Sequence, residues 1–79
     1  IEELVAQVWS EILQVEKIGI YDNFIDLGGN SFDAIRVMTR LNNKVDLELP
    51  LNQVFQKPTI SLLSAKIEKT ILKMLEELN

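Results

Sequence analysis

The apolar residues at the start of the chain recur at the spacing of an amphipathic helix. Between residues 1 and 14 they follow an i, i+3, i+4, i+7, i+8 pattern: Ile1, Leu4, Val5, Val8, Trp9, Ile12 and Leu13. Glu2 and Glu3 fall in the first turn, where the helix dipole favours negative charge. We therefore expect a helix over residues 1–14 whose apolar face, including Trp9, packs into a core.

The segment 15–30 combines turn-forming residues with large apolar ones. Its glycine, aspartate and asparagine residues predict a loop, whereas its isoleucine, phenylalanine and leucine residues are unlike a flexible linker. Long connections with their own packed side chains are often functional. We expect an ordered first loop that lies over the helices, with Phe24 and Leu27 buried in the core.

Three more elements are predicted before residue 59. Helical spacing continues from about Ser31 to about Lys44, and the segment 45–51 then alternates apolar and polar residues. Because this segment has no second strand to pair with, we expect an extended connector that touches the core through three residues, Val45, Leu47 and Leu49. Pro50 suits the first position of a short helix with apolar residues Leu51, Val54 and Phe55, which Lys57-Pro58 ends.

A last helix is predicted after Thr59, whose side chain can cap it. Its apolar stripe runs nearly to the end of the chain: Ile60, Leu63, Ile67, Ile71, Met74, Leu75 and Leu78. We expect one domain over residues 1–79, with a core of about 3–69 and a helix extension or linker over 70–79. The predicted fold is all-α, a four-helix bundle of three main helices and one short helix with a long ordered first loop.

Composition narrows the possible functions. A chain of 79 residues and 9.0 kDa buries about 63% of its surface on folding, which is too little for an enclosed active site. Cysteine and histidine are absent, so the usual general base and the usual zinc ligands are missing, and we expect neither an enzyme nor a metal site. The net charge of −4 disfavours nucleic acid and anionic membranes as partners. The start at Ile1 suggests a segment of a longer polypeptide or a processed end.

The sequence Gly28-Gly29-Asn30-Ser31-Phe32 is the most informative stretch. It lacks the second glycine, the preceding strand and the histidine of a serine hydrolase elbow. It also lacks the ligand spacing of a calcium loop and the Gly-Lys-Ser/Thr of a phosphate-binding loop. A serine without an adjacent base is a poor nucleophile, so catalysis by Ser31 is excluded.

Two interpretations of Ser31 remain. In the first, Ser31 is only the N-cap of a helix in a passive interaction module. In the second, its hydroxyl is an attachment point for a phosphodiester, which the helix dipole and the outward N–H groups would stabilise. A helical wheel that starts at Ser31 places five residues on one core arc, with Met38 at its edge: Ala34, Val37, Met38, Leu41 and Val45. It places Phe32 about 100° from Ser31 and away from this arc, so Phe32, Ile35 and Met38 are candidates for a docking patch beside Ser31.

The chain resembles the peptidyl carrier, or thiolation, domains of nonribosomal peptide synthetases. The resemblance is carried by the D-x-F-x-x-L-G-G-x-S pattern that begins at Asp22 and ends at Ser31, followed at the expected offsets by Leu49-Pro50-Leu51 and Pro58-Thr59-Ile60. It covers roughly residues 3–69. Asn30 stands where histidine is frequent in the family, and Phe32 where leucine is more usual. Asn30, Arg36 and Arg40 favour the peptidyl class over fatty-acid carriers, although an acyl or aryl carrier remains the alternative.

The resemblance implies a non-catalytic carrier with an acyl-carrier-like fold. Ser31 would bear 4′-phosphopantetheine, installed from coenzyme A by a phosphopantetheinyl transferase, with Gly29 and Asn30 beside it and room for the modifying enzyme. The thiol of the arm would hold aminoacyl or peptidyl thioesters and present them to adenylation, condensation and thioesterase domains. Partner contacts are expected at Phe32, Ile35, Met38 and Leu27. We further expect a cytoplasmic domain that is monomeric when excised.

Overall fold

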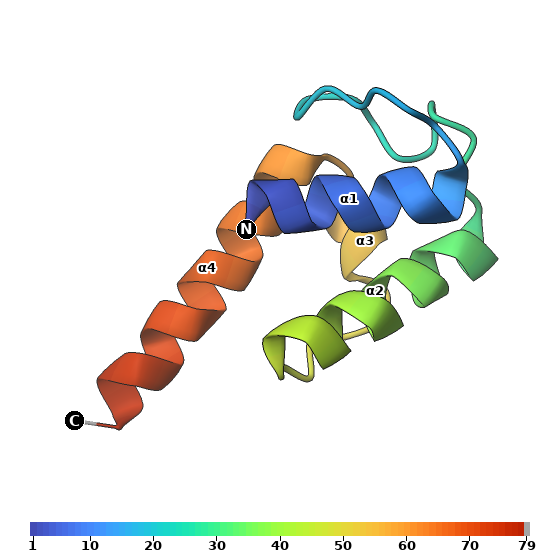
Figure 1. Cartoon of the computed structure of the whole chain (residues 1–79). Helices are drawn as coiled ribbons and strands as arrows, with labels where there is room; N and C mark the ends of the chain where they lie inside the picture. Colours follow the sequence, from blue (N-terminus) through green and yellow to red (C-terminus); the bar gives the residue numbers. More distant parts are fainter. Residues whose placement is uncertain (79) are drawn as a thin grey trace.

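The computed structural model describes residues 1–78, so the final residue of the expected 70–79 extension lies outside the described residues. It contains α1 (Glu2–Leu13), α2 (Ser31–Val45), α3 (Gln53–Gln56) and α4 (Ile60–Glu77), as Figure 1 shows. No strand occurs in this part of the chain. The predicted all-α fold of three main helices and one short helix is confirmed.

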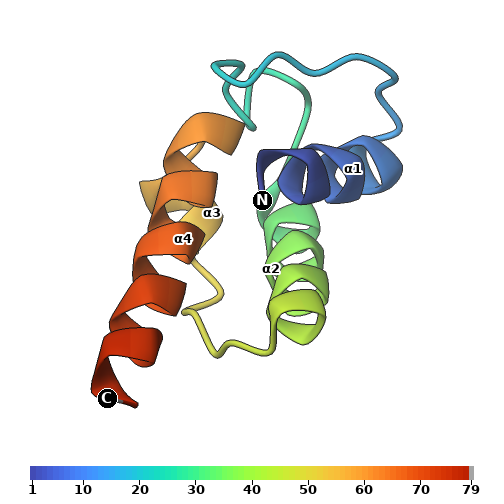
Figure 2. The ribbon, with the colours of Figure 1, turned by 60° about the vertical axis from the view of Figure 1, so that its left-hand side comes forward.

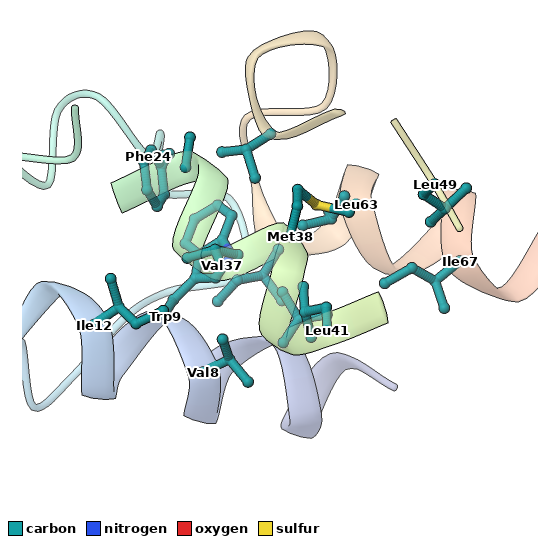
Figure 3. Close-up of a cluster of buried hydrophobic side chains, with 14 of the residues drawn as sticks. Val8, Trp9, Ile12, Phe24, Val37, Met38, Leu41, Leu49, Leu63 and Ile67 are labelled. Carbon is teal, nitrogen blue, oxygen red and sulfur yellow. The ribbon is translucent and has the colours of Figure 1, made fainter. Parts of the chain in front are cut away.

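The core forms where the apolar stripes of the long helices meet. α1 packs against α2 and α4, while α3 packs against α2 (Figures 1 and 2). Trp9 lies at the centre of α1 and meets Phe24 of the first loop edge to face, with ring centroids 4.9 Å apart and an interplanar angle of 74°. The largest completely buried side chains include both rings and the aliphatic residues shown in Figure 3: Trp9, Phe24, Met38, Leu41, Leu63 and Ile67.

The first loop is fixed to the beginning of α4. The Phe24 N–H donates to the Pro58 carbonyl at 2.8 Å, and the Ser61 N–H donates to the Ile20 carbonyl at 2.9 Å. The loop therefore arches over one end of the bundle and returns to α2 (Figure 2). The prediction that this loop is ordered and buries Phe24 is confirmed, whereas Leu27 is only half-buried against the core.

In the connector after α2, backbone groups form hydrogen bonds with the Asn42 side chain and not with a second strand. The Asn42 amide donates to the Leu49 carbonyl at 3.0 Å, and its oxygen accepts from the Leu49 N–H at 3.1 Å. This pairing satisfies both backbone groups of the buried Leu49 without a neighbouring strand. Leu47 and Leu49 are buried and Val45 is half-buried, which confirms the predicted contacts.

The prediction for the short helix was wrong in its start and its packed face. Pro50 lies in a turn, closed by the Gln53 N–H donating to the Pro50 carbonyl at 3.1 Å, and α3 begins only at Gln53. Pro50 is the first residue of this turn, and Leu51 and Asn52 are its two central residues, so the chain turns once before the helix begins. Of the three apolar residues expected to pack, only Val54 is buried, and Leu51 and Phe55 are exposed.

The last helix begins as predicted and then extends past the bundle. The Thr59 hydroxyl accepts from the Leu62 N–H at 3.2 Å, which confirms the cap. Burial ends at Ile67 and becomes partial at Ile71, although the helix continues to Glu77 (Figure 1). The last apolar residues of the helix are exposed and lie in the segment 70–79, for which we expected a helix extension or linker: Met74, Leu75 and Leu78.

Candidate functional site

The turn before α2 depends on both of its glycines, for different reasons. Gly28 has a φ of 96°, in the left-handed region that residues with a side chain rarely adopt. Gly29 is buried, and a Cβ atom added to it would lie 2.3 Å from the Phe24 ring. Its N–H donates to the Phe24 carbonyl at 3.1 Å. Gly29 therefore locks the turn onto the core and does not open space for an enzyme, which corrects our expectation for it.

Asn30, and not Ser31, is the N-cap of α2. The Asn30 side chain accepts from the Asp33 N–H at 2.9 Å, and the Asp33 carboxylate accepts from the Asn30 N–H at 3.4 Å. These two bonds form a capping box, which fixes where the helix starts. The interpretation of Ser31 as only a cap is wrong, because Asn30 stands at the cap position with the extended backbone of φ −120° and ψ −178°.

Ser31 is the first residue of α2, and its side chain is exposed. Within residues 1–78 its hydroxyl makes no hydrogen bond, and the N–H groups of Ser31 and Phe32 donate to no protein atom. The first N–H groups of a helix have no partner inside the helix, and the dipole makes this end favourable for an anion. The structure thus presents a free hydroxyl beside two free donors.

The four expected partner-contact residues differ sharply in exposure. Phe32 is 78% exposed and Ile35 is 46% exposed, so both can be reached from outside. Leu27 is half-buried. Met38 is completely buried among the core side chains (Figure 3), so the expectation that it contacts a partner was wrong. Met38 lies at the edge of the predicted core arc, and contact with the other helices covers that edge.

The two arginines of α2 lie on its solvent side, each beside one carboxylate. A guanidinium nitrogen of Arg36 lies 3.5 Å from an Asp33 oxygen, and Arg40 donates to the Glu11 carboxylate of α1 at 2.9 Å. The role of Asp33 in the capping box was not predicted from the sequence. The capping-box spacing, with an acidic residue three positions after Asn30, was the available signal.

Residues able to perform acid–base or metal chemistry do not gather around Ser31. The part of the chain described by the structure holds no group of three or more acidic residues, histidines or cysteines that could bind a metal ion. No helix in it is both long and apolar enough for a membrane span. The arrangement offers a reachable hydroxyl at a helix start, next to an apolar surface.

A family model described as a phosphopantetheine attachment site matches residues 3–67 of the chain. Among curated proteins, bacitracin synthase 1 of Bacillus licheniformis is 45% identical over 67 residues, which is 85% of this chain and 1% of that protein. The chain therefore spans only about one hundredth of the length of such relatives.

Solved structures with the same fold include a carrier protein in complex with the phosphopantetheine transferase Sfp and coenzyme A. That match has a TM-score of 0.81 and 35% identity, and it covers 86% of this chain and 88% of the other. The McyG A-PCP structure, complexed with phenylalanyl-adenylate, gives a TM-score of 0.80 and 39% identity over 84% of this chain and 10% of that one.

Proposed function

The chain belongs to the phosphopantetheine attachment family, and from this premise we propose that Ser31 is the residue that carries 4′-phosphopantetheine. The single observation that carries this proposal is the exposed, unbonded Ser31 hydroxyl at the start of α2. The other serines are less suitable: Ser64 is buried, the Ser10 hydroxyl donates to the Val15 carbonyl, and Ser61 is only half-exposed.

The residues around Ser31 fit the group. A phosphodiester on the Ser31 oxygen would lie at the helix end, where the free N–H groups of Ser31 and Phe32 can donate to its oxygens. Asp33 is the nearest acidic residue in the sequence, but its carboxylate faces the Asn30 N–H and Arg36, which lowers its repulsion of an anion. When bound, the group supplies a thiol that can hold acyl groups as thioesters.

In the attachment step the Ser31 oxygen forms a bond to the pantetheine-side phosphorus of coenzyme A. The bond between that phosphorus and the bridging diphosphate oxygen breaks, and adenosine 3′,5′-bisphosphate leaves. The proton of the hydroxyl must pass to a base on the transferase, because the chain has no histidine and the structure places no free base beside Ser31. This chain contributes the acceptor oxygen and the dipolar helix end.

We propose that the domain is a carrier in a nonribosomal peptide synthetase and has no catalytic activity of its own. It would hold aminoacyl or peptidyl groups and present them in turn to adenylation, condensation and thioesterase domains. Similarity to bacitracin synthase 1 and to the McyG A-PCP supports the first of these roles, which is to hold an aminoacyl or peptidyl group. Short-lived docking suits such a cycle, because each partner has to release the domain before the next can bind.

The attachment site can be tested by mass spectrometry of the intact protein. The apo domain is incubated with coenzyme A and Sfp, and the wild type should gain the mass of one phosphopantetheine group. Ser31→Ala should gain nothing, while the matched control Ser61→Ala should load as the wild type does. An adduct on Ser31→Ala, or a wild type that stays unmodified, would refute the proposal.

A further inference from the structure

The end of α4 presents an apolar surface that no other element in residues 1–78 covers. We call it the α4 ridge and define it by five residues: Ile71, Leu72, Met74, Leu75 and Leu78. Ile71 is half-buried, and the exposed fractions of the other four are 60%, 46%, 53% and 82% in chain order. In Figures 1 and 2 this part of α4 projects beyond the other helices. Apolar residues that are exposed as a group, and not singly, are typical of a surface that contacts another molecule.

The α4 ridge continues the buried stripe of the same helix and has the spacing that helix–helix contacts use. At 100° per residue, three of its members lie within about 40° of the completely buried Ile67: Ile71, Met74 and Leu78. With Leu75 at about 80°, four residues follow the i, i+3, i+4, i+7 spacing of the anchors in an amphipathic helix. Leu72 joins Ile71 and Ile1 in a shallow hollow between α4 and the start of α1. A second helix laid along α4 can therefore bury the whole row.

Carboxylates border the α4 ridge on both sides. Glu68 lines the hollow between α4 and the start of α1. Asp46 and Glu48 of the connector line a second hollow, which reaches Met74. All three are exposed, and the ion pairs found in the part of the chain that the structure describes involve other residues. The lysines of this half of α4 lie on the opposite side of the helix, at about 200–260° from Ile67: Lys66, Lys69 and Lys73. The border of the ridge is therefore negative and its charges have no cation beside them.

The charge of this border selects the kind of partner. A second copy of the chain would bring carboxylates against carboxylates, and an anionic membrane would be repelled, because like charges placed opposite one another weaken association. A partner that carries cations beside an apolar face gains from both the ridge and its border. We propose that the α4 ridge is a docking surface for an amphipathic helix with a leucine-rich face flanked by lysine or arginine. This inference goes beyond the proposed function, because no part of the surface involves Ser31.

The probe is a fluorescein-labelled helical peptide of about 20 residues, with leucine at heptad positions a and d and lysine at the other positions. Fluorescence anisotropy gives its dissociation constant for the domain. A second peptide with glutamate in place of lysine has the same apolar face and the opposite charge. It should bind at least about tenfold more weakly at low ionic strength, and added salt should reduce the difference.

Two pairs of variants test the apolar and the charged parts separately. Leu75→Gln should weaken binding of the lysine peptide by about tenfold, because an apolar contact is lost. Its matched control is Leu62→Gln, a leucine of the same helix with similar exposure, 48% against 53%, on the side away from the ridge. The control should stay within about twofold of the wild type. Glu68→Lys should weaken binding more than Glu76→Lys, which makes the same change of net charge at about 180° from Ile67.

A wild type that binds neither peptide, or both equally well, would overturn the inference, and so would equal losses for Leu75→Gln and Leu62→Gln. A dimer of the domain in analytical ultracentrifugation that Leu75→Gln dissociates would assign the ridge to a second copy instead. Binding to vesicles of phosphatidylcholine and phosphatidylglycerol that Leu75→Gln abolishes would assign it to a membrane.

Circular dichroism shows whether each variant keeps its helices. If Leu75→Gln shortens α4, Glu68→Lys decides the question, since it leaves the apolar residues of the ridge in place. Ser31→Ala should bind the lysine peptide as the wild type does. Failure of peptide binding therefore refutes only the docking surface, and failure of phosphopantetheine loading refutes only the proposed function.

Discussion

Replacing Asn30 should cost more stability than replacing Ser31, although the two are neighbours and both are residue types that cap helices. The Asn30 side chain accepts from the Asp33 N–H at 2.9 Å, whereas the Ser31 hydroxyl bonds to nothing in residues 1–78. Asn30→Ala leaves that N–H without a protein partner and should lower the free energy of unfolding by about 1 kcal/mol. Ser31→Ala removes no bond and should stay within about 0.5 kcal/mol of the wild type.

Thermal unfolding followed by circular dichroism can resolve this difference. A loss of about 1 kcal/mol corresponds to a fall in Tm of roughly 4–8 °C for a domain of this size. Asn30→Asp is the matched control, because its carboxylate can still accept from the Asp33 N–H, and it should restore most of the lost stability.

Phosphopantetheine loading separates the same variants in the opposite order. Asn30→Ala should still load, although it is less stable, whereas Ser31→Ala should keep its stability and never load. A larger loss of Tm for Ser31→Ala than for Asn30→Ala would refute our assignment of the cap and would return Ser31 to a structural role.

Three further predictions concern packing. Gly29→Ala should lower the free energy of unfolding by about 1–3 kcal/mol in urea titrations, because its Cβ would collide with the buried Phe24 ring; a neutral result would show that the ring can move aside. Met38→Ala should lower it by about 2–5 kcal/mol in the same titrations, whereas Phe32→Ala should change it by less than about 0.5 kcal/mol; the reverse order would mean that the faces of α2 are misassigned. Truncation after Ile71 removes no buried residue among those that the structure describes, so the Tm should stay within a few degrees of that of the full chain, and a collapse would show that the end of α4 supports the core.

The helices could be predicted because their apolar residues recur at helical spacing. The core arc of α2 and the Thr59 cap appear in the structure as expected, and both depend on residues near in sequence. The burial of Phe24 was also foreseen, from the apolar content of a loop rich in turn formers.

The wrong predictions concern residues for which the local sequence pattern fits two structures, and contacts with residues distant in the sequence determine which of the two forms. Asn30 and Ser31 can both cap a helix, and the contact of Gly29 with the Phe24 ring fixes where the chain turns into α2. Met38 lies at the edge of the predicted core arc, and only the packing of the other helices shows that this edge is covered. The exposed end of α4 is not among these errors, because residues 70–79 were expected to be a helix extension or linker.

Contacts that run from Gly29 through Phe24 to Trp9 give the domain an intrinsic fluorescence probe. Trp9 is the chain's only tryptophan, it is completely shielded from water, and its indole meets the ring on which the turn before Ser31 rests. Any lifting of that turn during modification would change the surroundings of the indole. The fluorescence of Trp9 in the unlabelled protein can therefore report in real time whether the loop stays packed on the core, without a dye near Ser31.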